Sequence, residues 1–278
     1  MSNVTVNTNY SALVALQNLN KTNQEMESVQ NRINTGLKVA DARDNGAVFA
    51  IAQTMRGKVS AYGVAAQTLD KAISTLDVSI AAANTLSDLL NQMKEKATAA
   101  RDTTLSTAQR AAYNADFAQL RDQIVRTVAN AEFNGHNLIS ASGESVTAFA
   151  NDTGSSLITI TATSLALGGS VVTVGVSEAI TTATLAIAAL SRVDASITNL
   201  NTQLARFGSG ANALETHRAF VGKLTDALES GLGNLVDADL AKESARLQAL
   251  QVKQQLGSQA LTIANRAPQI ILSFFQGG

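Results

Sequence analysis

The sequence contains no cysteine and no tryptophan, a single proline in 278 residues, and only 4% aromatic residues. Without cysteine the chain cannot form disulfides, thiolate metal sites or a cysteine nucleophile, and its redox compartment stays undetermined. So few large side chains argue against a thick globular core. The apolar fraction of 45% is filled largely by 47 alanines, a composition that suits long helices packed side by side at close range.

Net charge and long apolar runs are also lacking. The 21 basic residues nearly cancel the 22 acidic ones, so no strong field favours nucleic acid, an anionic membrane surface or a polyanionic substrate. The longest charge-free stretch, 153–177, is rich in Thr, Ser and Gly, so we expect no transmembrane helix and no membrane insertion. The chain starts without the basic and apolar regions of a secretory signal peptide, so the protein either stays inside the cell or leaves by another route.

Apolar residues recur at steps of three, four and seven along most of the chain, which predicts amphipathic helices. The predicted helices cover the N-terminal region to about Gly36, then residues 47–100, 106–131 and 190–235, and a last segment from Ala238 that Pro268 interrupts. The 190–235 stretch fits a coiled-coil heptad. We therefore expect a mainly α fold, a long antiparallel helical bundle or coiled coil, with a discontinuous helical domain formed by both termini.

A β excursion separates the helical halves. Residues 157–162 and part of 170–176 alternate at period two, with Gly168-Gly169 between them as a turn, which predicts a small β-hairpin. The whole pattern predicts three parts. They are a terminal coiled-coil domain of residues 1–45 and 236–278, a helical rod of 46–139 and 186–235, and the excursion of 140–185.

Few residues suggest chemistry. Residues 208–213 fit the G-x-G-x-x-A fingerprint of dinucleotide sites, but a heptad helix precedes them in place of a buried strand, so we interpret them as an irregularity within the rod. His136 and His217 lack a companion histidine at metal-ligand spacing. Asp237 and Asp239 are suited to cap the last helix. We expect no metal, no cofactor and no enzyme; a nucleotide-binding oxidoreductase that uses residues 208–213 is the alternative from another class.

Several segments, in order along the chain, resemble bacterial flagellin. The stretches that carry the resemblance are Asn7-Thr8-Asn9, Asn31 to Lys38, Ala42 to Ala47, Glu132-Phe133-Asn134-Gly135, Asp237 to Glu243, Gln259-Ala260-Leu261 and Pro268-Gln269. The match covers nearly all of the chain except residues 140–185. It implies a structural protomer of the flagellar filament that polymerises into a helical tube for swimming, without the large outer domains of many flagellins. A hook–filament junction protein, which resembles flagellin at its ends, is the nearest alternative.

The resemblance also implies partners and a location. The partners are other copies of the chain in a helical homopolymer, a flagellar export chaperone, the type III export apparatus, and hook-associated and cap proteins. Export by that apparatus needs no cleaved signal peptide. It would place the protein outside the cell, in the filament.

Contacts between subunits are expected at two places. Charges of alternating sign surround the first loop, and on an ordinary monomer they would be a solvated face. The apolar residues of the last helix need the N-terminal helix and neighbouring subunits to bury them. The expected polymerisation contacts are Arg32, Ile33, Arg43, Asp44, Leu247, Leu250, Leu261, Ile270 and Phe274.

Two further sets of residues follow from the resemblance. Gln92 and Lys96 align with an Arg and a Leu by which many flagellins contact the animal flagellin receptor, so we expect a poor agonist. Some flagellins are O-glycosylated in the region of the β excursion. The candidate modification sites are Ser155, Ser156, Thr161, Thr163 and Ser164.

Overall fold

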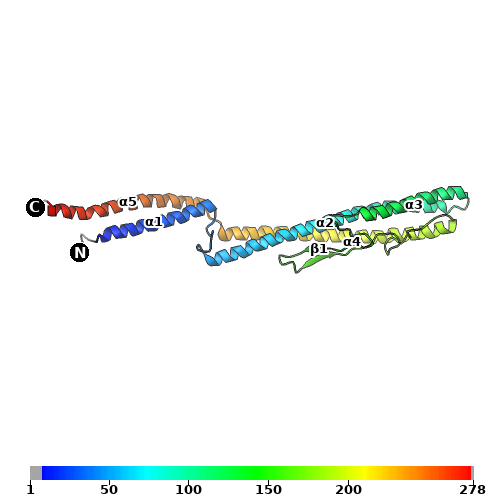
Figure 1. The fold of residues 1–278 in the computed structure, drawn as a ribbon, viewed down its shortest axis with the longest axis horizontal. Helices are drawn as coiled ribbons and strands as arrows, with labels where there is room; N and C mark the ends of the chain where they lie inside the picture. Colours follow the sequence, from blue (N-terminus) through cyan, green and yellow to red (C-terminus); the bar gives the residue numbers. More distant parts are fainter. Residues whose placement is uncertain (1–7, 277–278) are drawn as a thin grey trace. The chain divides into compact units, whose positions relative to one another are not determined.

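The computed structural model of the chain describes residues 8–276, with side chains described as far as Arg266. The helices are α1 (Tyr10–Thr35), α2 (Gly46–Ala100), α3 (Thr107–Asn130), α4 (Ala183–Val236) and α5 (Leu240–Gln276), and the strands are β1 (Val146–Phe149) and β2 (Leu157–Ile160) (Figure 1). The predicted mainly α fold is confirmed. Within the described residues no helix is long and apolar enough to cross a membrane.

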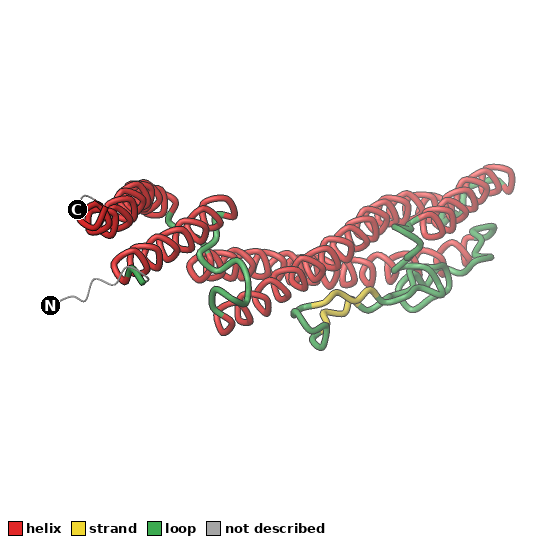
Figure 2. The backbone as a smooth tube through the Cα atoms, turned by 60° about the vertical axis from the view of Figure 1, so that its left-hand side comes forward, coloured by secondary structure: helices red, strands yellow, loops and turns green. Residues whose placement is uncertain are grey.

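Two compact units divide the chain. One unit combines Met1–Gly57 with Leu228–Gly278, and the other is Lys58–Ala227. The boundaries fall within α2 and α4. In the first unit α1 and α5 lie side by side, as both views show (Figures 1 and 2).

The unit of residues 58–227 is built on heptads. Along α4 the residues Val193, Leu200, Phe207, Leu214 and Val221 follow one another by seven, and each is at most 2% exposed. Leucines and a methionine of α2 and the apolar face of α3 complete this core. The heptad expected for the long helix is therefore confirmed, and it packs within the chain.

The turn between α2 and α3 is closed by local polar contacts. Ser106 caps α3 in a capping box, because its side chain accepts from the N–H of Gln109 and the Gln109 side chain accepts from the N–H of Ser106. Arg110 is nearly buried and donates to the carbonyls of Ala100 and Asp102. These bonds satisfy groups that the ends of both helices leave free.

The hairpin differs from the predicted one. β2 pairs antiparallel with β1, with Val146 opposite Ile160 and Phe149 opposite Leu157. The two strands, yellow in Figure 2, are in the unit of residues 58–227. Residues 170–176 form no strand, so that part of the prediction is wrong. Their alternation has another cause, namely that Val172 and Val174 are fully buried side chains of a loop.

Two predicted interruptions of helices are also wrong. α5 continues through Pro268 to Gln276, because a proline removes one backbone donor while the hydrogen bonds of the neighbouring turns can persist. α4 is continuous through residues 208–213. Gly210 serves packing instead: a Cβ placed there would lie 2.9 Å from the Cδ1 atom of Ile160 in β2. The glycine lets the hairpin approach the helix closely.

Candidate assembly site

The side of α5 that faces α1 is a regular seam. Between Leu240 and Arg266, the α5 residues that are buried or half-buried follow one another by three or four, as in a coiled coil. They are Glu243, Leu247, Leu250, Gln254, Gly257, Leu261 and Ala264. A matching series runs along α1, formed by Ala12, Ala15, Leu19, Thr22, Met26, Val29, Ile33 and Gly36. Leu247, Leu250, Leu261 and Ile33, expected at subunit contacts, thus lie on the seam within one chain.

A second apolar series lies on the opposite side of α5. Val252, Leu256 and Ile263 are each more than half exposed. Each follows a seam residue by two positions, which places it about 200° around the helix from the seam. On α1, Tyr10 and Leu13 are exposed in the same way. A helix that is apolar on opposite sides needs a partner on each, and the sequence analysis did not single out these outward residues.

The segment after α1 is fixed by backbone pairing. Gly36 ends α1 in the left-handed conformation, with φ of 71°, and its carbonyl accepts from the N–H of Ala238 at 2.8 Å. The N–H of Lys38 donates to the carbonyl of Val236 at 2.7 Å. Val236 also shares a small apolar cluster with Val39 and Ala52. The segment that follows α1 is therefore held against the segment that precedes α5.

The charged loop of residues 38–45 is organised by its own acids. Asp44 accepts from the N–H groups of Ala40 and Asp41, at 2.9 and 3.3 Å. Asp41 in turn accepts from the N–H groups of Arg43 and Asp44. Such bonds define a turn without any partner molecule. Asp44 therefore has a structural role that the sequence pattern did not indicate.

A groove of about 460 Å³ separates this loop from the last turns of α1. It is lined by Arg32, Arg43 and Asp44 together with Glu27 and Asn31, among others. Three of the residues expected at polymerisation contacts thus meet on one surface. The side chains of Ile270 and Phe274, the remaining two of these expected contacts, lie beyond those that the structure describes.

The residues aligned with the receptor contact lie on α2. Gln92 is exposed, whereas Lys96 is half-buried and pairs with Asp116 of α3 at 2.7 Å. The Lys96 ammonium also lies 6.0 Å from the ring centre of Tyr113. The hydrogen bond and the charge of Asp116 raise the pKa of Lys96 above its ordinary value.

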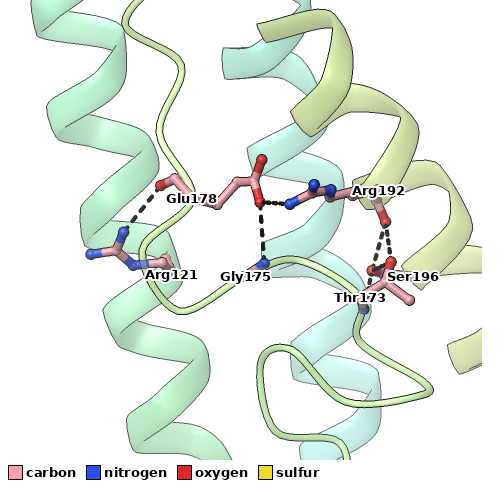
Figure 3. Close-up of polar contacts among 6 residues, drawn as sticks. All are labelled: Arg121, Thr173, Gly175, Glu178, Arg192 and Ser196. Carbon is pink, nitrogen blue, oxygen red and sulfur yellow. Dashed lines mark hydrogen bonds and ion pairs between the residues drawn. The ribbon is translucent and has the colours of Figure 1, made fainter. Parts of the chain in front are cut away.

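The loop that leads from β2 to α4 is held by a cluster of polar contacts (Figure 3). Glu178 is the centre of this cluster: its carboxylate pairs with Arg192 and accepts from the N–H of Gly175, and its carbonyl accepts from Arg121 at 3.0 Å. Beside it, the hydroxyl of the buried Ser196 accepts from the N–H of Thr173 at 2.9 Å. The loop is thereby fastened to α3 and α4.

The candidate modification sites differ in accessibility. Ser155, Ser156 and Thr161 are exposed, while Thr163 and Ser164 are half-buried. Ser155 and Ser156 lie in the turn between β1 and β2, where the carboxamide of Asn151 donates to the Ser155 hydroxyl at 2.8 Å. The first three side chains are therefore more accessible than those of Thr163 and Ser164.

The residues considered for chemistry have ordinary structural partners. A ring nitrogen of His217 lies 2.8 Å from the carbonyl of Ala150, and His136 lies 3.7 Å from Glu144. Asp239 accepts from the first N–H groups of α5, as expected of a cap. Among residues 8–276 no group of three or more His, Cys, Asp or Glu side chains could hold a metal ion.

The motif at residues 208–213 also lacks the geometry of a nucleotide site. These residues lie inside the continuous helix α4, so their N–H groups face helical carbonyls. A dinucleotide site needs a strand, a tight turn and a free helix N-terminus. The arrangement gives no support to an oxidoreductase.

Solved structures share this fold. A flagellin from Bacillus cereus matches with a TM-score of 0.51 and 23% identity, over 55% of this chain and 88% of that one. A Vibrio parahaemolyticus protein described as hook-associated matches with a TM-score of 0.56 and 13% identity, over 70% of this chain and 100% of the other. At these identities the likeness shows the class of fold alone, that of the helical proteins of the flagellum.

Sequence comparisons define the family. Residues 6–144 match the bacterial flagellin N-terminal helical region, and residues 190–275 match the C-terminal helical region. Flagellin FljN of Caulobacter vibrioides is 48% identical over 98% of each chain, and FljJ of the same organism is 45% identical over 99% of each. A flagellin of Brucella melitensis is 34% identical over 97% of this chain and 98% of its own.

The chain belongs to the bacterial flagellin family, in a short form without large outer domains. It is a structural protomer of the flagellar filament. The hook–filament junction alternative is not favoured, because the similar proteins of nearly equal length are flagellins. The family is one of structural proteins rather than enzymes.

Proposed function

We propose that copies of this chain polymerise through the outward apolar faces of α1 and α5, while the seam between these helices holds each protomer together. The observation that carries the proposal is the second apolar series on α5, formed by Val252, Leu256 and Ile263. Burying one such side chain contributes about 1.5–3 kcal/mol. Repeated, non-closing contacts of this kind generate a helical polymer.

Polar substitutions on the outward face test this proposal. Leu256→Gln combined with Ile263→Gln is expected to stop seeded elongation, seen by electron microscopy, because the contact with the next copy loses its apolar burial. Helix content by circular dichroism is expected to stay unchanged, since both residues are 64–65% exposed in the protomer. The matched control is Val64→Gln with Phe220→Gln, two exposed apolar residues of the other unit. Filaments of normal length from the α5 variant would contradict the proposal.

Both terminal helices are required in this scheme. Deletion of residues 238–278 removes the seam leucines Leu247, Leu250 and Leu261 and also the positions Ile270 and Phe274. We expect that deletion to abolish polymerisation while residues 58–227, whose core is their own, keep their helical signal. Ile33 on α1 acts through the same seam.

The groove beside the charged loop is a second contact between subunits in this proposal. In this proposal Arg32, Arg43 and Asp44 face a neighbouring copy. Asp44→Lys then places a positive charge near a basic residue in a partly desolvated contact, which costs about 1–3 kcal/mol per interface. Asp44 also holds the loop, so Asp44→Asn is the control, since it keeps an acceptor oxygen for the N–H groups of Ala40 and Asp41. Equal depolymerisation temperatures for the two variants would identify the loop as a solvated face.

Export completes the proposed function. The chain would leave the cell through the flagellar type III apparatus with the help of an export chaperone, and join hook-associated and cap proteins outside. The absence of cysteine is compatible with passage as an unfolded chain. The test is the culture medium of a strain without the export apparatus: the protein is expected to be missing there, and its presence would reject this route.

A further inference from the structure

The pairing of α1 with α5 includes polar contacts along its length. There are three between described residues: Asn9 to the carbonyl of Ala264 at 2.7 Å, Gln254 to Asn23 at 2.8 Å, and Arg32 to Glu243 at 3.4 Å. As the residue number rises on α1 it falls on α5, so the helices are antiparallel. The partners' numbers sum to between 273 and 277, so all three contacts belong to one register.

Two of these contacts use seam positions of α5. Glu243 and Gln254 stand where a coiled coil has apolar residues, and Glu243 is only 8% exposed. Burying a carboxylate is costly unless it is paired. Polar residues at such positions fix the register of coiled coils at a cost in stability.

The apolar part of the seam discriminates poorly between registers. Among the seam residues whose side chains the structure describes, Val29 on α1 and Leu250 on α5 are the only buried apolar ones, and five of the other thirteen are alanine or glycine. A slide by one heptad in one direction would again set large side chains against small ones, with Leu19 opposite Ala264 in place of Gly257. The same slide would move Arg32 about 10.5 Å away from Glu243. The ion pair is therefore far more sensitive to register than the apolar contacts are.

Each member of the ion pair depends on the other. The Oε2 atom of Glu243 and the Nε atom of Arg32 are buried and have no hydrogen-bond partner within the described part of the chain. The single contact between Nη1 and Oε1 is what compensates the two charges. Losing Arg32 leaves the nearly buried carboxylate of Glu243 without this partner, whereas the Arg32 side chain, 29% exposed, still reaches water.

We propose that Arg32 and Glu243 are positioning residues that fix the register of α1 against α5, with Asn23 and Gln254 as a second, weaker contact of the same kind. This inference rests on the proposed function, because only a fixed register presents the outward residues of the two helices to the next copy in a constant arrangement.

The absence of native cysteine allows register to be measured by disulfide formation. A Cβ placed on Gly257 would lie 3.9 Å from the Cβ of Leu19, within the range of disulfides. Leu19→Cys with Gly257→Cys therefore reports the native register. Leu19→Cys with Ala264→Cys, or with Leu250→Cys, reports a slide of one heptad in either direction.

The full-length chain is oxidised both free and in seeded filaments, and links are quantified by mass spectrometry. Chains of two nitrogen isotopes are mixed so that links within one chain are counted separately. With Arg32 and Glu243 present, the native pair is expected to link and the shifted pairs to link at most about a tenth as well. With Arg32→Leu and Glu243→Leu, the ratio of shifted to native links is expected to rise at least roughly tenfold, which corresponds to about 1.4 kcal/mol.

Rescue and controls make the result specific. The exchange Arg32→Glu with Glu243→Arg is expected to restore the native ratio. Lys94→Leu with Asp194→Leu, which removes an exposed ion pair of the other unit, should leave the ratio unchanged. If the double leucine variant loses helix content, Glu243→Gln alone is used and should also raise the ratio. An unchanged ratio in these seam variants would overturn the inference.

The two proposals can fail separately. If the variant with Leu256→Gln and Ile263→Gln forms filaments of normal length while the native cysteine pair still links in preference to the shifted pairs, the assembly surface is wrong and the register inference stands. If the native chain elongates, the outward-face variant does not, and the ratio of shifted to native links stays the same without Arg32 and Glu243, the assembly surface stands. The ion pair then does not set the register.

Discussion

At the scale of single residues, two glycines of α4 show how the surroundings decide whether an added side chain changes the stability of the fold. A Cβ added at Gly208 would meet nothing within 4 Å. At Gly210 it would meet Ile160 at 2.9 Å, closer than Cβ atoms are found in proteins. Both lie in the same helix and have the same intrinsic cost there relative to alanine.

Gly208→Ala is therefore expected to raise the free energy of unfolding by about 0.5–1 kcal/mol. Gly210→Ala gains the same amount but must displace Ile160, which costs about 0.5–1.5 kcal/mol if the side chain leaves its rotamer. Adding Ile160→Val, which removes the close Cδ1 atom, is expected to lessen that displacement cost. Urea denaturation of the three variants measures this. Equal gains at Gly208 and Gly210 would show that the hairpin does not need the glycine.

The ion pair of Lys96 gives a pH prediction. Its folded pKa lies above the ordinary value of 10.5, so its contribution to stability is fully present below that value and is lost as the pH rises through the folded pKa. In Asp116→Asn the cause of the shift is gone, and the pKa of Lys96 is expected to fall. Titration of the lysine side chain by NMR compares the two proteins. An unchanged midpoint would show that Asp116 does not hold the ammonium.

The same lysine tests the receptor prediction. Gln92→Arg with Lys96→Leu is expected to raise potency on reporter cells about a hundredfold, because the pair restores a planar donor group and an apolar contact. Each contact contributes about 2 kcal/mol to binding, and the two contributions need not add fully. Lys94→Leu, which removes a neighbouring ion-paired lysine of α2, is the control. Equal potency of native and double-mutant protein at nanomolar dose would refute the prediction.

At the scale of elements, the loop from β2 to α4 is fixed by polar contacts to helices rather than by strand pairing. Thr173, whose N–H would serve a ladder in a strand, donates instead to the hydroxyl of Ser196. Asn199 donates to the carbonyl of Ser170. These backbone groups already have hydrogen-bond partners, so the loop does not need a paired strand to satisfy them.

Ser196→Ala tests this arrangement. The substitution leaves the N–H of the half-buried Thr173 without its acceptor, so the free energy of unfolding is expected to fall by about 1–3 kcal/mol. Ser209→Ala is the matched control. Both hydroxyls donate to the carbonyl four residues earlier in α4, Ser196 to Arg192 and Ser209 to Ala205, but Ser209 is exposed. Thermal unfolding compares them. Equal effects would mean that the buried hydroxyl contributes only its helical bond.

These elements also show what sequence reasoning could predict. The heptad of α4 and the extent of the helix α3, expected over 106–131, follow from local spacing, which the structure keeps. The partner of β2 did not follow, because period two describes burial and does not identify which strand pairs. The outward face of α5 was missed for a related reason: the three-four spacing identifies the seam residues such as Leu250, and the role of an apolar residue off that spacing, such as Leu256, is recognised only from its exposure in the folded chain.

At the scale of the whole molecule, exposure narrows the modification prediction. Ser155, Ser156 and Thr161 are exposed, and a glycan there would displace little packing. We expect the intact mass of native filament protein to exceed the sequence mass of 28.9 kDa, with the added groups mapped to peptides that contain these three residues. An intact mass equal to the sequence mass would refute the prediction for the strain used. Glycans found only at Thr163 or Ser164 would contradict the expectation that modification follows the exposure of the side chain.

The apolar residues on the free side of α5 have a consequence for the concentration at which the protein can exist. In the proposed assembly, a protomer that exposes Leu256 and Ile263 has a solubility limit set by the same contact that adds it to a polymer. Each tenfold increase in its critical concentration corresponds to about 1.4 kcal/mol of lost subunit contact. Leu256→Gln would therefore raise both the critical concentration and the amount of protein that stays in solution. A cell that makes this protein must keep its free pool below that limit until each copy reaches the growing end.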